Sequence, residues 1–333
     1  MRELMIQNNE AGQRLDKFLS KYMNRAPKSF FYKMLRKKNI TLNGKKAEGK
    51  EILSTGDRVK LFLSDDTICQ FSEHREYGIY TARFEGAAGK PDIIYEDAHT
   101  LFMNKPVGML SQKAKPDDIS LVEYLTSYLL DTGQLTQESL RTFHPGVCNR
   151  LDRNTSGIVA AGKSLAALQQ LSAMFHDRSI RKYYLCLVKG TVSRTARLSG
   201  YLTKDSRTNR VTVQSVKPDP QITGAAPIET EYRPLKAAGG TTLLEVHLIT
   251  GKTHQIRAHL AAEGHPLIGD YKYGDRHLND EFKRSYGLES QMLHSCRLCF
   301  PHCTGALSPL SGKELTADPP ELFLKICRDR GVM

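Results

Sequence analysis

The interpretation of this chain starts from nine consecutive residues, Asn149-Arg150-Leu151-Asp152-Arg153-Asn154-Thr155-Ser156-Gly157. They place one carboxylate, Asp152, between two arginines, and nearby positive charge favours the ionised form of a carboxylate. A short polar turn then leads into the apolar run 158–162, which is typical of a buried strand. From these residues alone, the aspartate could serve as a nucleophile, as a base or as a structural ion-pair partner.

The length and composition set the broad class of the protein. The chain has 333 residues, of which 40% are hydrophobic and 25% charged, as expected for a soluble protein with one large and one small domain. No apolar run approaches the roughly 20 residues of a membrane helix, and residues 1–10 lack the apolar segment of a signal peptide. The seven cysteines are odd in number and mostly scattered, which predicts reduced thiols and a cytoplasmic location.

The net charge of +12 is concentrated near the N-terminus. Residues 12–63 contain 14 Lys or Arg and 4 Asp or Glu, so 14 − 4 gives +10 in this segment alone. Apolar residues at helical spacing predict one helix over 14–23 and a second that starts near Pro27. The Asn43-Gly44 turn predicts a hairpin, and an alternating strand follows over 59–63.

A basic helix next to a small hairpin has two interpretations, a merely solvated face and a surface that binds phosphate backbone. The segments Arg14 to Leu19, Arg36 to Ile40 and Asn43-Gly44 favour the second, because they resemble the S-four-type RNA-binding domain over residues 12–75. In that family the second helix and the following loop face RNA. The resemblance implies six RNA-binding candidates: Lys33, Arg36, Lys37, Lys38, Lys45 and Lys46.

A glycine-rich stretch within residues 76–91 predicts a linker, and a second domain is expected over 92–326. Its expected elements are strands around a turn near Lys105, helices over 120–130 and from 165, and strands and hairpins over 182–249. A short helix should follow and end at Gly264. On composition alone, Lys105 is an ordinary surface lysine.

Two clusters have the residue types of a metal site but not the spacing. His254 and His259 are five residues apart, which does not place them on one helix face. Cys296 and Cys299 have no second cysteine pair nearby, and the alternation around them predicts a strand. We therefore expect no metal.

Five blocks in order give the chain its family resemblance. They are Asn104-Lys105-Pro106-Val107-Gly108, the nine residues quoted above, and the segments 182–190, 251–259 and 293–302. Together they resemble RluA-type pseudouridine synthases, whose signature is His-Arg-Leu-Asp-Arg-x-Thr-Ser-Gly. One departure is Asn149, which stands where that family usually has histidine and cannot carry a charge.

The resemblance implies a fold and a set of roles. The fold class is α+β, with a long, mostly antiparallel mixed sheet, a central cleft and a small N-terminal RNA-binding domain. Asp152 would be the nucleophile or base, Arg257 would pair with it, and Tyr184 would stack on a flipped uracil. Arg150 would bind RNA by filling the space that the base leaves. No cofactor or metal is implied.

The expected activity is isomerisation of uridine to pseudouridine in structured RNA. Ribosomal RNA is favoured because family members with this domain order act on it, and transfer RNA is the alternative. A catalytically silent RNA-binding or assembly factor is a second alternative, favoured only by Asn149. A glycosidase lacks a clear second carboxylate motif. No obligate protein partner is evident, and a monomer is expected.

Overall fold

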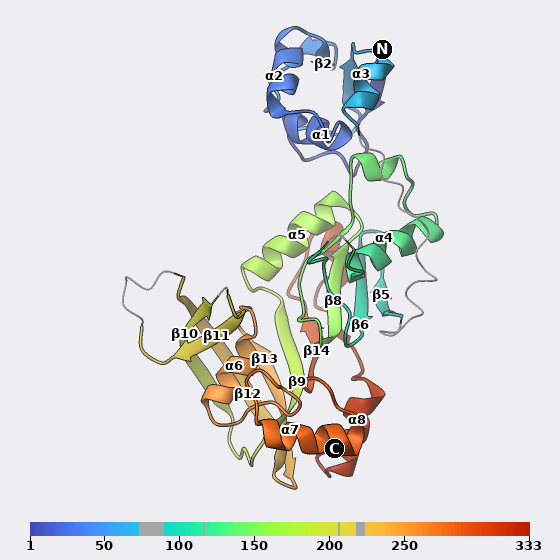
Figure 1. Cartoon of the computed structure of the whole chain (residues 1–333). Helices are drawn as coiled ribbons and strands as arrows, with labels where there is room; N and C mark the ends of the chain where they lie inside the picture. Colours follow the sequence, from blue (N-terminus) through green and yellow to red (C-terminus); the bar gives the residue numbers. More distant parts are fainter. Residues whose placement is uncertain (73–89, 116, 206, 218–223) are drawn as a thin grey trace.

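A computed structural model describes residues 1–72, 90–115, 117–205, 207–217 and 224–333 (Figure 1). The predicted linker lies almost entirely outside these residues. A four-stranded sheet near the N-terminus and an eleven-stranded sheet in the remainder organise the molecule. In the described parts of the chain, no helix is both long and apolar enough to cross a membrane.

The N-terminal unit is a small antiparallel sheet covered by short helices. Its strands pair in the order β1-β4-β2-β3, and the leucines and phenylalanines of the two expected helices fill one core. The sheet includes β1, which precedes the range 12–75. The elements are β1 (Arg2–Met5), α1 (Leu15–Tyr22), α2 (Lys28–Arg36), β2 (Ile40–Leu42), β3 (Lys45–Lys46), β4 (Arg58–Leu61) and α3 (Asp65–Gln70).

The large sheet confirms the expected mixed, mostly antiparallel arrangement. Its main path runs β11-β10-β12-β13-β9-β14-β8-β6-β5, and every pair is antiparallel except β14 with β8. The strands are β5 (Asp92–Glu96), β6 (Thr100–Lys105), β7 (Gly146–Val147), β8 (Ser156–Gly162), β9 (Arg181–Lys189), β10 (Ala196–Asp205), β11 (Arg210–Gln214), β12 (Ala226–Ala238), β13 (Thr241–Leu248), β14 (Leu293–Cys299) and β15 (Glu314–Thr316).

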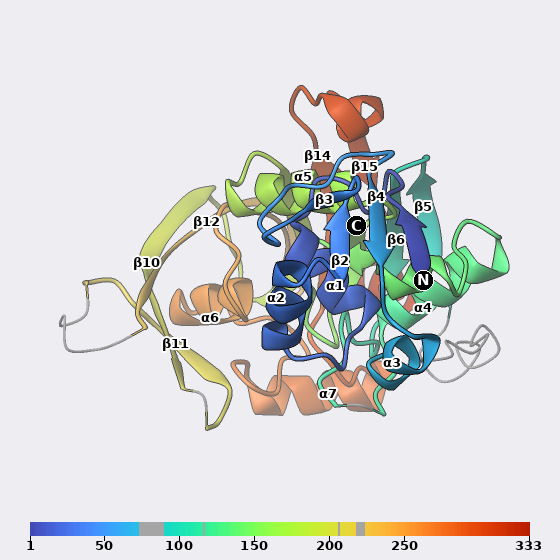
Figure 2. The same ribbon diagram turned by 90° about the horizontal axis from the view of Figure 1, so that it is seen from above.

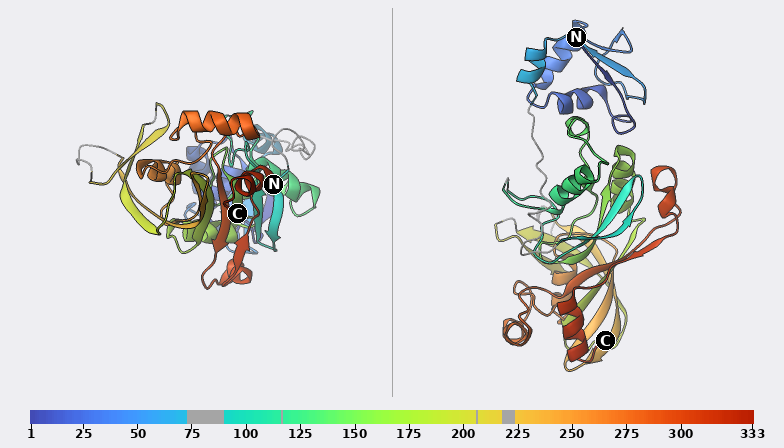
Figure 3. Two further views of the ribbon diagram at one scale, coloured as in Figure 1. Left: turned by 90° about the horizontal axis from the view of Figure 1, so that it is seen from below. Right: turned by 90° about the vertical axis from the view of Figure 1, so that its right-hand side faces the viewer.

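Helices cover this sheet on both faces. The expected helices α4 (Leu121–Asp131), α5 (Leu165–His176) and α6 (Gln255–Ala262) are present, and β10, β11 and β12 curve past α6 in Figure 2. Helices α7 (Arg276–Tyr286) and α8 (Glu321–Asp329) have no counterpart among the expected elements. They pack together against β9 and β13, far from the N-terminal unit (Figures 1 and 3).

The centre of the sheet is apolar on both faces, which explains the uninterrupted apolar run of β8. Val159 and Ala161 join the core beneath α4, whereas Ile158 and Ala160 join the core beneath α5. A strand buried on both faces has no reason to alternate apolar with polar residues. Cys296 and Cys299 lie on β14 as predicted, with Cys296 at a shift in the register of β14 against β9.

The two units touch through the segment that follows α4. Thr142 donates a hydrogen bond from Oγ1 to Oε1 of Glu10 at 2.7 Å. Next to it, the guanidinium of Arg141 lies 4.2 Å from the centre of the Tyr22 ring. These contacts fix how the end of α1 meets the larger unit.

Gly157 lets the polar turn of the signature enter the sheet. Its φ is +113°, a conformation that residues with a side chain rarely adopt. A Cβ atom added here would lie 2.2 Å from the carbonyl oxygen of Ser295, its neighbour on β14. The signature loop can therefore approach β14 only because residue 157 has no side chain.

Replacing Gly157 with alanine should destabilise the fold by about 2–6 kcal/mol, because backbone strain and overpacking each cost about 1–3 kcal/mol. Gly133→Ala is the matched control, since Gly133 also has a positive φ (+69°) but no atom within 4 Å of an added Cβ. Urea unfolding of both variants checks this. Equal losses of stability would contradict the close approach at Gly157.

Candidate active site

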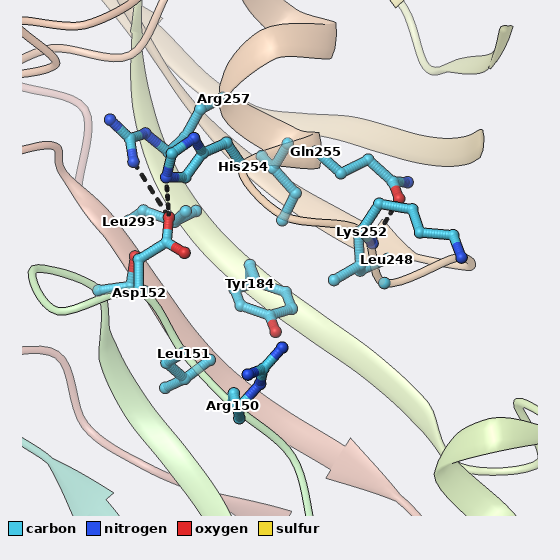
Figure 4. A pocket seen from close by; sticks show the side chains of 13 residues that line it. Arg150, Leu151, Asp152, Tyr184, Leu248, Lys252, His254, Gln255, Arg257 and Leu293 are labelled. Carbon is cyan, nitrogen blue, oxygen red and sulfur yellow. Dashed lines mark hydrogen bonds and ion pairs between the residues drawn. The ribbon is translucent and has the colours of Figure 1, made fainter. Parts of the chain in front are cut away.

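Asp152 lies in the loop between β7 and β8, at the bottom of a cleft. Its side chain is 27% exposed, and Nη1 of Arg257 donates a hydrogen bond to its Oδ2 at 3.0 Å (Figure 4). Arg257 projects from α6, more than a hundred residues later in the chain. The structure therefore brings together the two residues expected to form the central pair.

The same guanidinium also holds a second carboxylate, that of Asp270. Nε and Nη2 of Arg257 donate to Oδ2 and Oδ1 of Asp270 at 2.7 and 2.9 Å. Burial alone would raise the pKa of Asp270, but the bonds from Arg257 and from the backbone N–H groups of Lys272 and Tyr273 keep that pKa below its usual value. Asp270 thus fixes Arg257 as an ionised, two-sided donor. No role for Asp270 was expected from the sequence.

His254 is a further neighbour of Asp152 to which sequence analysis gave no role. It precedes α6 with φ 55°, and its Nε2 lies 3.8 Å from Oδ2 of Asp152. The hydroxyl of Tyr273 accepts the N–H of Val211 and lies 2.9 Å from Nδ1 of His254. Because that hydroxyl can donate its hydrogen to Nδ1, the ring hydrogen is left on Nε2, facing Asp152. Burial lowers the pKa of His254 and favours this neutral form.

Buried polar groups hold the backbone of the Asp152 loop on both sides. The ammonium of Lys105, fully buried, donates to the carbonyls of Pro106, Met109 and Arg153. Burial lowers the pKa of Lys105 to about 7, while Asp152 opposes that shift. Ser111 accepts from the N–H of Leu151 and donates to its carbonyl. Lys105 is therefore a buried anchor, so the composition-based interpretation as a surface lysine is wrong.

Ser156 and His294 join this loop to β14. Oγ of Ser156 lies 2.9 Å from Nδ1 of His294, and Nε2 of His294 lies 3.0 Å from the carbonyl of Ala317. A carbonyl can only accept, so the ring hydrogen is on Nε2 and Nδ1 accepts from Ser156. Burial lowers the pKa of His294 to about 4, which keeps the ring neutral at pH 7.

Asn149, the departure from the family signature, pairs with the backbone of β8. Its Nδ2 donates to the carbonyl of Ile158 at 3.1 Å, and its Oδ1 accepts the N–H of Ala160 at 2.8 Å. An amide side chain can do both, as a backbone amide does. Neither bond involves Asp152, so the geometry gives Asn149 a structural task.

Tyr184 and Arg150 line the pocket in front of Asp152. Tyr184 projects from β9, is 5% exposed and forms part of the pocket wall; burial raises the pKa of its hydroxyl. The exposed Arg150 side chain points toward that hydroxyl in Figure 4. The pocket of about 90 Å³ opens into a cleft of about 1130 Å³. Among the described residues that line either space, Asp152 is the single carboxylate.

The six basic candidates of the N-terminal unit all lie on its surface. Four belong to α2 or directly follow it, and two form β3 of the small hairpin. Their side chains are exposed, whereas Phe31 and Leu35 of the same helix are buried. The right-hand view in Figure 3 places this unit at one end of the molecule. The structure thus leaves these cations accessible, away from the pocket of Asp152.

Comparison with known proteins bears directly on this site. The model of the RNA pseudouridylate synthase family matches residues 99–262, and that of the S4 domain matches residues 13–59. The ribosomal large subunit pseudouridine synthase C of Vibrio cholerae is 30% identical over 315 residues, which cover 95% of this chain and 91% of that protein. The chain belongs to the RNA pseudouridylate synthase family. It is accordingly a pseudouridine synthase, and the resemblance seen in the sequence is confirmed.

Two further comparisons support the same assignment. The protein of the same description from Vibrio vulnificus is 30% identical over 297 residues, covering 89% of this chain and 87% of that one. A solved structure of human RNA pseudouridylate synthase domain containing 4 superposes with a TM-score of 0.56 at 20% identity, over 71% of this chain and 91% of that chain. The predicted α+β pseudouridine synthase fold is confirmed.

Asp270→Asn should destabilise the synthase by about 3–5 kcal/mol at pH 7, because it removes one of the two charges that neutralise the buried Arg257 and sets an NH2 group against one of its donors. In the unfolded chain Asp270 ionises near pH 4, whereas in the folded protein its pKa is lower. The wild-type carboxylate therefore stabilises the fold above about pH 4, and this stabilisation is lost as the pH falls through the folded pKa. The stability gap between variant and wild type should therefore narrow in acid. Urea unfolding from pH 7 to pH 3 measures it.

Asp329→Asn is the control, since Asp329 forms an exposed ion pair with Lys325 that is worth at most about 1 kcal/mol. A similar small loss for Asp270→Asn, at every pH, would show that Arg257 does not depend on Asp270.

Asn149→Ala should lower stability by about 1–3 kcal/mol, because it leaves two β8 backbone groups without partners. Turnover by the folded fraction should stay within about threefold of wild type. Unfolding curves and initial rates on the same preparation separate the two effects. A hundredfold lower kcat with unchanged stability would instead place Asn149 in the reaction.

Proposed function

We propose that the protein isomerises uridines of large-subunit ribosomal RNA, with Asp152 as the reacting carboxylate. The observation that carries this is the carboxylate held by Arg257 in a pocket lined by Tyr184. In the reaction the bond between N1 of uracil and C1′ of ribose breaks, and a bond between C5 and C1′ forms. The hydrogen on C5 leaves as a proton and N1 gains one, so the reaction needs neither redox change nor water as a reactant.

The cleft suits an isomerase better than a glycosidase. Hydrolysis of a glycosidic bond ordinarily requires two carboxylates that flank the bond. The second carboxylate that Arg257 binds, Asp270, is 1% exposed, and both of its oxygens accept from that guanidinium. It cannot reach a substrate, so Asp152 acts on the nucleotide without a carboxylate partner.

The target base enters the pocket by leaving its helical stack. A base inside a duplex cannot reach a recessed carboxylate, so the nucleotide is turned outward. The Tyr184 ring then contacts the uracil, and such contacts are worth about 1–3 kcal/mol. Arg150 lines the pocket and is exposed, so it can swing out and fill the gap in the RNA. His254 and Arg257 keep Asp152 aligned during the exchange.

Large-subunit ribosomal RNA is the proposed substrate because of the basic N-terminal unit and the description carried by the relatives. The surface cations Lys33, Arg36, Lys37, Lys38, Lys45 and Lys46 would bind its phosphate backbone away from the reacting uridine. All seven cysteines are free, which fits a cytoplasmic protein. A monomer that carries both units suffices for this task.

Asp152→Ala should abolish tritium release from unmodified ribosomal RNA labelled at C5 of uridine, with a rate at least about 10⁴-fold below wild type. Its affinity for the same RNA should change less than about threefold, because the other cleft residues remain. Rates and filter-binding constants measured side by side test both statements. An Asp152→Ala variant that still releases tritium would overturn the role of Asp152.

The same assay decides between the substrates. Release from transfer RNA but not from ribosomal RNA would replace the proposed substrate with the alternative. If wild type releases no tritium from either RNA while binding RNA tightly, the chain is a binding factor without activity.

Replacing Lys33, Lys37 and Lys45 together with glutamine should weaken ribosomal RNA binding and flatten its salt dependence. Each phosphate contact contributes about 0.7–0.9 to the slope of log affinity against log salt. The control replaces Lys325 and Arg328 of α8, at the opposite end of the molecule, with glutamine (Figure 1). An unchanged slope for the triple variant would exclude the N-terminal unit from RNA binding.

A further inference from the structure

Lys182 is a buried cation that faces the cleft beside Tyr184. It lies near the start of β9, is 7% exposed and lines the cleft. Alternate residues of a strand share one face of the sheet, so Lys182 lies on the face of Tyr184, about 7 Å along the strand. The neighbouring residues Arg181 and Tyr183 belong to the opposite face.

Nothing in the described part of the chain neutralises this lysine. No hydrogen bond or ion pair joins its ammonium to another described residue, in contrast to Lys105 with three carbonyls and Lys163 with Glu96. Burial, and then the positive charge of Arg178, lower the pKa of Lys182. The side chain is mostly buried, but its Nζ borders the cleft, where an anion can reach it, and a largely buried cation without an anion is unfavourable. A ligand that brings negative charge would relieve this cost.

Two neighbours leave room for such a ligand. Arg178 follows the end of α5, is exposed and lines the same cleft. Its φ is +69°, a left-handed conformation that glycine usually adopts at the end of a helix. On the other side, Nζ of Lys182 lies 3.7 Å from the position of a Cβ on Gly251, so the absent side chain keeps the approach open. Two cations and a glycine thus border one part of the cleft.

We infer that Lys182 and Arg178 form a phosphate-binding site for the RNA backbone next to the nucleotide that enters the Asp152 pocket. The inference rests on the proposed function, because it takes RNA as the ligand. The short distance along β9 to Tyr184 assigns the site to a phosphate adjacent to the flipped base. The charge of the buried lysine is then compensated only in the complex with RNA.

Lys182→Met tests this inference because it keeps the length and apolar packing of the side chain but removes its charge. The thermal unfolding temperature should stay the same or rise by a few degrees, since an uncompensated buried charge is lost. Binding of unmodified ribosomal RNA should weaken about tenfold, and the salt slope should fall by about one. In the tritium assay KM should rise more than kcat falls.

Three companion variants separate phosphate binding from other effects. Lys182→Arg keeps the charge and should bind RNA within about threefold of wild type. Arg178→Gly removes a charge and suits the positive φ, so it should also weaken RNA binding without loss of stability. Arg181→Met changes a neighbouring exposed cation on the opposite sheet face and should leave the binding constant and salt slope unchanged.

The contrary outcomes are distinct. Loss of stability in Lys182→Met, together with an unchanged salt slope in both Lys182→Met and Arg178→Gly, would show that these residues are structural and overturn the inference. Normal tritium release by wild type in the same experiment would leave the proposed function intact. Wild-type protein that neither binds nor modifies the RNA would overturn the proposed function, and the inference with it.

Discussion

The guanidinium of Arg257 lies between two carboxylates, and this shared ion pair joins the segments from which the pocket is built. One edge holds Asp152 on the loop before β8, and the other holds Asp270 on the loop before α7. Arg257 is itself 7% exposed on the first turn of α6. A planar guanidinium can donate to both partners at once, which a lysine cannot do. The position of the Asp152 carboxylate is therefore set by a residue far away in the sequence.

The remaining contacts of the loop serve the same purpose. Lys105 and Ser111 satisfy backbone groups on the two sides of Asp152, Asn149 bonds to the backbone of β8, and Ser156 with His294 fixes the loop against β14. Such fully bonded networks are rigid, and a group held in place beforehand needs little rearrangement during the reaction. The cations that line the cleft are not bonded in this way. Arg150, Arg178 and Lys182 lack anionic partners among the described residues and are available to RNA.

Much of the fold could be predicted from short sequence patterns, and the pairing of Asp152 with Arg257 was expected from the family resemblance of the motifs that contain them. The helical spacing before Tyr22 and the apolar run of β8 each determine a local structure, and the motifs around Asp152 and Arg257 are contiguous. The task of Asn149 could not be predicted, because it depends on which backbone groups of β8 lie opposite. Lys182 was visible only as part of a strand motif, since the lack of a partner is a property of three-dimensional surroundings. Asp270 reaches Arg257 only because the chain turns after Leu267, and that contact is not visible in the sequence.

The central claim is that the planar, two-sided guanidinium of Arg257 positions Asp152 for the reaction. Single-turnover tritium release by Arg257→Lys, with saturating protein, tests it most directly, because lysine keeps the charge but cannot bind both carboxylates. The rate should fall at least about 100-fold while RNA affinity stays within about threefold of wild type. A variant that is folded, binds RNA and reacts at the wild-type rate would contradict the claim, since a simple positive charge would then suffice.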